Sequence, residues 1–346
     1  MTATKRIAKP NPTNISWATH TFNPLYKNIS HELGRVAHGC NKVSPACSNC
    51  YSELMNVEQR FLGDGKPYKG ISYNDMYFDR PSLKELSKGK KQKAIFICSM
   101  TDWAAVNEFV RMDDAVDLLQ ACATSKHLCY LLTKRAECLP EILRLWQIKY
   151  RVDEWPPNVW LGFTAENQKW FDKRWQHFTD EDGVLGRFSD VNVFVSYEPA
   201  LDRLVLPESF YYNPYRVGHR EPTHEPLIIK YRDNGTAYSP ELEFKKLNTS
   251  GGRWLIAGGE SGTKARKYSD LKKWFVDIKN QCNKSGVKFF FKQWGTYIPK
   301  LNEWIVPGAI ETAQEHQHDM VNGARRKDND LLFGQAFKDT PLNRGS

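Results

Sequence analysis

From residue 94 onward the chain repeats one pattern, in which a short apolar run and a polar turn precede an amphipathic stretch. Each run is nearly continuous in apolar residues, as expected of strands buried on both faces of a parallel sheet. The predicted strands are Ala94–Cys98, Leu128–Leu132, Asn158–Gly162, Asn192–Val195, Trp254–Ala257 and Val287–Phe291. Six such units restrict the chain to α/β folds with a mostly parallel sheet.

Between the runs, apolar residues recur at intervals of three and four, which predicts amphipathic helices. The expected helices cover Asp113–Ser125, Glu137–Trp146, Gln168–Phe178 and Ser269–Lys284, the last capped by Ser269 and ended by Ser285-Gly286. This alternation favours a full or partial (β/α) TIM-like barrel, with an open doubly wound sheet as the structural rival.

The 346 residues suffice for a single barrel domain, which we place at 1–340 with a tail at 341–346. Residues 203–252 break the alternation and read as an insertion in which tyrosines alternate with arginines and lysines. Aromatic and basic side chains together can stack bases and hold phosphates, so Arg216 and Arg220 are candidate nucleic-acid contacts. The alternative is a solvated loop anchored by its tyrosines.

Charge and composition narrow the class of protein. Lysine and arginine exceed aspartate and glutamate by nine, which suits a polyanionic partner such as nucleic acid without requiring one. The chain shows no apolar segment suited to a membrane span, and its polar N-terminus has no secretion signal. We therefore expect a protein of the cytoplasm, without a membrane partner, whose eight cysteines are thiols or metal ligands.

Polar residues follow every predicted strand, at the ends that a parallel barrel gathers on one face. Those taken as candidate site residues are Ser99, Asp102, Thr133, Lys134, Glu198, Gly258, Gly259, Glu260, Lys292 and Gln293. Glu166 also follows a strand but is assigned no role. Lys292 comes directly after an apolar run, so it is either a perturbed base or the partner of Glu198 or Glu260 in an ion pair.

The strongest local signal is the cysteine loop, residues 38–51, where Cys40, Cys47 and Cys50 stand among Gly, Ser, Pro and Asn residues. A Cys-x-x-Cys pair lets two thiolates bind one ion or cluster, and the third cysteine closes the site from across the loop. With His38 as a fourth ligand the loop would hold structural zinc. Without a fourth ligand it would suit a four-iron, four-sulfur cluster with one iron open to a small molecule.

Several motifs together resemble a family of uncharacterised three-cysteine-motif proteins common in phages and prophages, related to radical S-adenosylmethionine enzymes. The matching segments are Ile15–Trp17, Thr21–Pro24, Gly39–Tyr51, Leu132–Arg135, Pro157–Gly162, Ser196–Pro199, Gly258–Gly262 and Phe290–Gly295. The likeness spans most of residues 15–340. It implies a TIM-barrel-like fold without implying a settled reaction.

With the cysteine loop and the phage context that the resemblance implies, our first hypothesis is a radical S-adenosylmethionine-type iron–sulfur enzyme. It would modify a nucleic-acid base or a nucleotide in a bacterial host cell, with a reductant protein as a further partner. Cys40, Cys47 and Cys50 would bind the cluster. Residues Ser99, Asp102, Thr133, Glu198, Gly258, Gly259 and Glu260 would line the S-adenosylmethionine cavity, where either Glu260 or Asp102 meets the amino group. Lys292 and Glu198 are the candidate catalytic residues. Candidate contacts to a carboxylate or phosphate of the substrate or cofactor are Lys134, Lys292 and Gln293, and Lys134 is also a candidate nucleic-acid contact.

Two other functions fit parts of the sequence. A zinc-stabilised nucleic-acid-binding protein without catalysis would use His38 and the three cysteines, but it leaves the acidic strand ends unexplained. A hydrolase or lyase with Glu198 and Glu260 as an acid and base pair would leave the cysteine loop without a role. The sequence does not indicate the oligomeric state.

Overall fold

The computed structural model describes residues 8–33, 36–59, 63–211, 251–262 and 264–297, together with four short strand segments at 230–231, 237–238, 331–332 and 335–336. Arg216, Arg220 and most of the predicted insertion 203–252 lie outside these residues.

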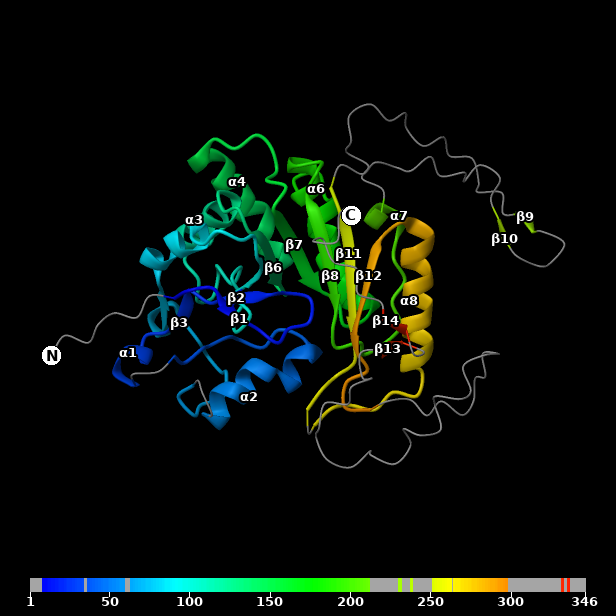
Figure 1. Cartoon of the computed structure of the whole chain (residues 1–346), viewed down its shortest axis with the longest axis horizontal. Coiled ribbons are helices and arrows are strands. Elements are labelled where there is room, and N and C mark those ends of the chain that lie inside the picture. The colour runs from blue at the N-terminus through cyan, green and yellow to red at the C-terminus, as the bar shows by residue number, and fades with distance from the viewer. Residues whose placement is uncertain are drawn as a thin grey trace.

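An eight-stranded sheet forms the centre of the molecule (Figure 1). In spatial order its strands are β1 (Asn11–Pro12), β2 (His20–Phe22), β5 (Ala94–Ile97), β6 (Leu128–Thr133), β7 (Val159–Thr164), β8 (Asn192–Tyr197), β11 (Arg253–Gly258) and β12 (Lys288–Gln293). All neighbouring pairs from β2 to β12 are parallel, and β1 is antiparallel to β2. The strands follow chain order without the reversal of a doubly wound sheet. Within the described residues β12 does not pair with β1 or β2, so the predicted full barrel is not observed.

The remaining strands form short antiparallel pairs. They are β3 (Leu25–Lys27) with β4 (Met76–Phe78), β9 (Lys230–Tyr231) with β10 (Ala237–Tyr238), and β13 (Leu331–Leu332) with β14 (Gln335–Ala336).

The helices of the described residues are α1 (Ser30–Leu33), α2 (Tyr51–Glu58), α3 (Met112–Ala123), α4 (Leu139–Tyr150), α5 (Gln168–Thr179), α6 (Val184–Arg187), α7 (Glu208–Tyr211) and α8 (Leu271–Ser285). Four 3₁₀ helices join them: η1 (Pro45–Asn49), η2 (Tyr73–Asp75), η3 (Arg80–Ser87) and η4 (Ala136–Cys138). Helix α8 begins after Asp270 rather than the predicted cap Ser269, and it ends at Gly286, whose φ of +70° is left-handed.

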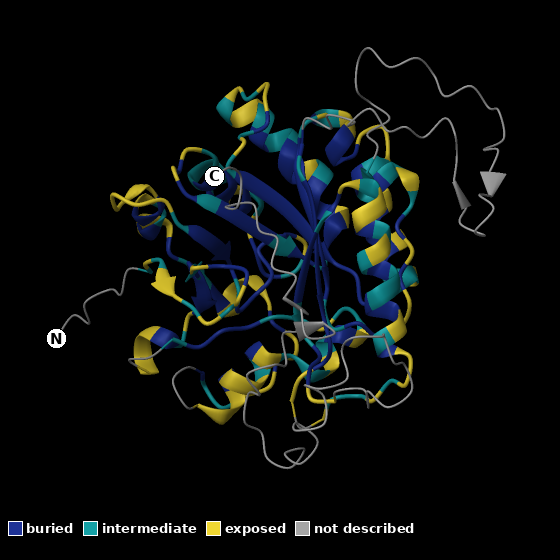
Figure 2. Cartoon of the chain, turned by 45° about the vertical axis from the view of Figure 1, so that its right-hand side comes forward, coloured by how far each residue is buried: buried dark blue, intermediate teal, exposed yellow. Residues whose placement is uncertain are grey.

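Two clusters of buried side chains lie on the two faces of the sheet. The larger one joins alternate strand residues, such as Ile95 and Leu131, to the apolar faces of α3, α4, α5 and α8. Figure 2 shows these helices dark blue toward the sheet and yellow toward solvent. Since α3, α4, α5 and α8 all pack on this face, these four helices do not cover the opposite one.

The opposite face carries an aromatic cluster: Trp17, Phe96, Tyr130, Trp160, Phe194, Trp254 and Phe290. Tyr130 on β6 and Trp254 on β11 are separated by two strands, which in a flat sheet would place their backbones about 14 Å apart. Their ring centroids nevertheless lie 5.4 Å apart, and Trp17 lies 6.0 Å from Trp254. The sheet is therefore strongly curved, with the aromatic cluster on its concave face.

Candidate functional site

Above the aromatic cluster, the carboxyl ends of the strands carry polar side chains that pair across neighbouring strands. The Lys134 ammonium donates to Thr164 Oγ1 at 3.2 Å, linking the ends of β6 and β7. The Lys292 ammonium lies 2.9 Å from Glu198 Oε1, and Ser196 Oγ donates to the other oxygen of Glu198 at 3.4 Å. Successive side chains of a strand point to opposite faces of the sheet. Lys134, Glu198 and Lys292 therefore lie on the same face as the aromatic residues two or four positions earlier in their strands.

Glycines allow neighbouring chain segments to approach closely at the carboxyl ends of the strands. A Cβ on Gly258 would lie 2.7 Å from Glu198 Oε1, and one on Gly259 would lie 1.7 Å from the carbonyl oxygen of Trp294. Lower on the concave face, Gly162 leaves room for the ring of Phe194, 2.4 Å from where its Cβ would be. The glycines thus set how closely the ends of β8, β11 and β12 approach.

The cysteine loop is held against these strand ends by Glu166, which follows β7. Its carboxylate lies 2.7 Å from Arg174 Nη1 of α5, and both side chains are at most 1% exposed. The backbone N–H of Ala46, between two cysteines of the loop, donates to Glu166 Oε1 at 3.5 Å. Burial opposes ionisation of Glu166, but the Arg174 charge and a hydrogen bond from Ser44 outweigh it and lower the pKa.

Glu260, after β11, holds the same loop from the other side. Arg266 donates from Nε to Glu260 Oε2 at 2.9 Å and from Nη2 to Oε1 at 2.5 Å. Asn49 of the loop donates to Glu260 Oε1 at 2.9 Å, and Arg266 Nη2 donates to the Pro45 carbonyl at 3.1 Å. Glu260 and Arg266 together bind both ends of η1.

A third anchor connects the loop to β5 and β6. Arg135 donates to Asp102 Oδ2 at 3.0 Å, to both oxygens of Glu108 and to the carbonyl of Asn41 at 3.1 Å. Asp102 also accepts from Thr133 Oγ1 at 2.7 Å and from backbone N–H groups. Burial opposes ionisation of Asp102, but Arg135 and these donors outweigh it, so its pKa is lowered.

The three cysteines of the loop are free thiols of intermediate exposure. Burial raises the pKa of Cys40 to about 12, with Arg135 opposing the effect and Asp102, Cys50 and Cys47 adding to it. Burial also raises the pKa of Cys50, against backbone donors and the Lys134 charge. The charges of Arg135 and Lys134 thus favour ionisation of Cys40 and Cys50 respectively, but burial prevails in both thiols.

The thiols do not form a ligating set as they stand. In the part of the chain that the structure describes, no three His, Cys, Asp or Glu side chains are arranged to hold a metal ion. His38 is buried, and its Nδ1 lies 3.2 Å from the carbonyl oxygen of Leu25. The donor set itself, three soft thiols in one loop, is the one that iron–sulfur clusters and zinc select.

The structure brings most of the predicted site residues to one edge of the sheet, but several already bind protein partners. Asp102, Thr133 and Glu260 belong to the anchors of the cysteine loop, and Ser99 exchanges hydrogen bonds with Asn23 at 3.2–3.3 Å. Gln293 donates to Ser261 at 2.6 Å. The carboxylates of Asp102 and Glu260 therefore position the loop in this structure. Lys134, Glu198 and Lys292 instead bind side chains at other strand ends.

Sequence reasoning did not select the residues that anchor the loop: Glu166, Arg174, Glu108, Arg135, Asn49 and Arg266. Glu166 carries a usable signal, because a glutamate directly after a strand buried on both faces needs a cationic partner. Its partner Arg174 lies eight residues later on the next helix, where no sequence signal distinguishes it from the other basic residues of α5.

A protein-family model described as a protein of unknown function (DUF5131) matches residues 12–341. No curated protein and no solved structure matches the chain significantly. None of the described helices is both long and apolar enough to cross a bilayer.

Proposed function

The chain belongs to the DUF5131 family of proteins of unknown function, and from that premise we propose that it is an iron–sulfur enzyme of the radical S-adenosylmethionine type. The proposed fold is a partial TIM-like barrel, and the proposed substrate is a nucleic-acid base or a nucleotide. The observation that carries the proposal is the seating of Cys40, Cys47 and Cys50 over the carboxyl ends of parallel strands. In barrel enzymes that edge holds the active site.

Strand order and curvature support the partial barrel. A parallel sheet in chain order with all its helices on one face closes into a barrel when enough strands are present. Here seven parallel strands curve until rings on β6 and β11 touch. The concave face then offers one polar end, above the aromatic cluster.

Cys40, Cys47 and Cys50 would hold the cluster, and the loop would have to bring their sulfur atoms onto it. When bound, such a cluster supplies the electron that reductively cleaves S-adenosylmethionine. Burial raises the pKa of Cys40 and Cys50, and the charges of Arg135 and Lys134 oppose that effect, so the two cations would help to hold thiolates once the loop binds a cluster. The three anchors fix the loop so that its thiols stay at the strand ends.

Lys134, Glu198 and Lys292 are the residues we assign to the cofactor. A lysine ammonium binds a carboxylate, and a glutamate carboxylate binds an amino group, so the Glu198–Lys292 pair matches the two charges of an amino acid. The pair is partly accessible, with side chains 13% and 30% exposed, so an incoming amino acid can exchange with it.

Metal analysis of protein purified without oxygen tests the proposal. We expect about four iron and four sulfide per chain, lost when Cys40, Cys47 or Cys50 is changed to Ala. Cys282→Ala is the matched control, because Cys282 is buried in α8 outside the loop and its loss should leave the iron content unchanged.

One zinc per chain with tetrahedral ligands, abolished by His38→Ala, would overturn the proposal in favour of a zinc-stabilised binding protein. His38 suits that role, because a carbonyl contact at Nδ1 is the arrangement that orients a metal-binding imidazole. An intact cluster that produces no 5′-deoxyadenosine from S-adenosylmethionine under reducing conditions would overturn the radical chemistry alone.

A further inference from the structure

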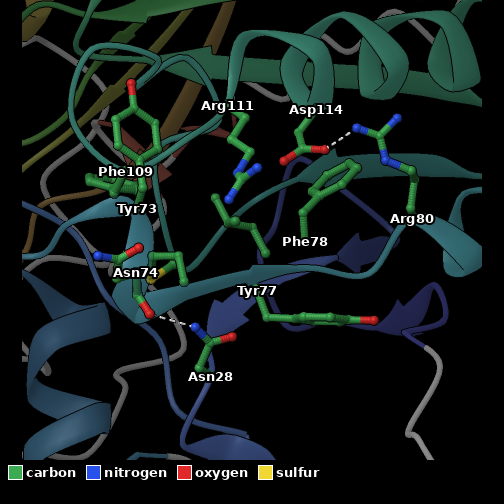
Figure 3. A pocket seen from close by; sticks show the side chains of 11 residues that line it. Asn28, Tyr73, Asn74, Tyr77, Phe78, Arg80, Phe109, Arg111 and Asp114 are labelled. Atoms are coloured by element: carbon green, nitrogen blue, oxygen red, sulfur yellow. Dashed lines mark hydrogen bonds and ion pairs between the residues drawn. The ribbon is translucent and has the colours of Figure 1, made fainter.

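A pocket outside the strand-end site opens between the β3–β4 pair and the start of α3 (Figure 3). Its volume is about 440 Å³, within the range of small-molecule sites. None of the predicted site residues lines it.

The walls of the pocket are rich in aromatic side chains, namely Tyr73, Tyr77, Phe78 and Phe109. Phe109 is fully packed and Tyr77 already packs against Tyr26 and His31, whereas Phe78 is half-buried and Tyr73 is 39% exposed. Aromatic rings that are partly exposed beside a cavity can stack on a planar ligand. Stacking on a nucleobase does not depend on the hydrogen-bonding groups of that base.

One cation in the pocket forms no hydrogen bond or ion pair in the described part of the chain. Arg111 stands at the start of α3 and is exposed, and no hydrogen bond or ion pair joins its guanidinium to another described residue. The other arginine, Arg80, is held by Asp114 and Asp117. Figure 3 shows Arg111 reaching from the start of α3 toward β4, while Arg80 is paired with Asp114 above the ring of Phe78.

The acidic group of the pocket, Asp114, lies near both arginines but forms its ion pair with Arg80. The pocket lining therefore carries two guanidinium groups and one carboxylate, which leaves a net positive charge. A guanidinium presents a planar set of donors that matches a phosphate. The pocket therefore combines stacking surface with one anion contact.

We propose that this pocket binds one nucleotide unit, with its base against the aromatic wall and its phosphate on Arg111. A free nucleotide and one residue of a single-stranded nucleic acid share this chemistry. The site lies close behind the cysteine loop, since Met76 lines the pocket and its sulfur lies 3.2 Å from where a Cβ on Gly39 would be. Binding here needs no metal in the loop.

Calorimetry on the full chain, with AMP, adenosine and a ten-nucleotide single-stranded oligonucleotide as probes, tests this assignment. We expect AMP to bind more tightly than adenosine to the unchanged protein. Arg111→Ala should weaken AMP about tenfold and leave adenosine unaffected, because only the phosphate contact is lost. Phe78→Leu, which keeps the apolar volume but removes the ring, should weaken both probes about tenfold.

Lys169→Ala is the control, because it removes one exposed charge from α5, away from the pocket lining. Binding of the oligonucleotide alone, lost in Arg111→Ala, would assign the site to nucleic acid, and AMP binding would assign it to free nucleotides. If none of the probes binds, or if Lys169→Ala weakens them as much as Arg111→Ala, the assignment is wrong. Because the metal-free protein is used, this outcome is independent of the iron analysis.

Discussion

Glu166 and Arg174 form an ion pair of 2.7 Å in which neither side chain exceeds 1% exposure, and the same glutamate accepts the backbone N–H of Ala46 in the cysteine loop. Two charges removed from water stabilise a fold only while both are present, because a lone buried charge is costly. The pair therefore couples the stability of the α5 region to the position of the loop.

Changing Glu166 to Gln should lower the free energy of unfolding by about 3 kcal/mol, since it leaves the Arg174 charge buried and unpaired. Urea denaturation measures the loss. The control is Glu141→Gln, which breaks the exposed Arg144–Glu141 pair and should cost less than about 1 kcal/mol. Equal losses in the two variants would contradict the argument.

Asp102 gives the protein a defined acid sensitivity. Because its folded pKa is lowered, its ionisation stabilises the fold fully above the unfolded pKa of about 4, and this stabilisation disappears as the pH falls through the folded value. Asp102→Asn should therefore be less stable than the unchanged protein at pH 7, with the difference narrowing below about pH 4.

Urea titrations between pH 7 and pH 3 measure this difference. Asp182→Asn serves as the comparison, since the Asp182 side chain is 97% exposed and its removal should give a small difference that hardly varies with pH. A gap for Asp102→Asn that stays constant through the acid range would refute the assignment.

Gly259→Ala should destabilise the protein by about 3 kcal/mol, because a Cβ there would meet the carbonyl oxygen of Trp294 at 1.7 Å and force the ends of β11 and β12 apart. Gly70→Ala is the comparison variant, because it introduces backbone strain without a steric clash. Gly70 has a φ of +63° with open space around it, so its replacement should cost about 1 kcal/mol. Thermal unfolding of the two variants compares them, and similar losses would show that the clash is relieved by local movement.

If the proposed function holds, Lys292→Met should weaken binding of S-adenosylmethionine to the reconstituted protein at least about tenfold, because it removes a cation that pairs with the ligand carboxylate. Lys288→Met is the matched variant, because Lys288 is the first residue of β12 and lies at its amino end, away from the carboxyl ends of the strands. Equilibrium dialysis measures both affinities. Loss of affinity in both variants alike would point to a general charge effect instead.

The core strands could be predicted from the sequence because a short continuous run of apolar residues is typical of a strand buried on both faces of a sheet. The predicted run Asn158–Gly162 becomes β7 at Val159–Thr164, extended because Phe163 and Thr164 pair with Val195 and Ser196 of β8. Strand β2, only His20–Phe22, was missed because it has no apolar run and is defined by its pairing with β5. Closure into a full barrel was also not predictable, since it depends on edge pairing rather than on any local pattern.

The grouping of polar side chains at one edge of the sheet could be predicted from the sequence. That Lys134, Glu198 and Lys292 gather at one edge follows from parallel strands alone. The sequence does not predict which carboxylates anchor the loop, because an ion pair such as Asp102–Arg135 depends on tertiary placement. Asp102 and Glu260 were expected to face a cofactor, yet each is held by protein donors that the sequence does not identify.

The aromatic cluster on the concave face bounds the strand-end site from within. Rings from six strands and Trp17 pack together beneath the polar strand ends. A ligand held by the cysteine loop would therefore have a floor of packed aromatic rings on the side away from the loop.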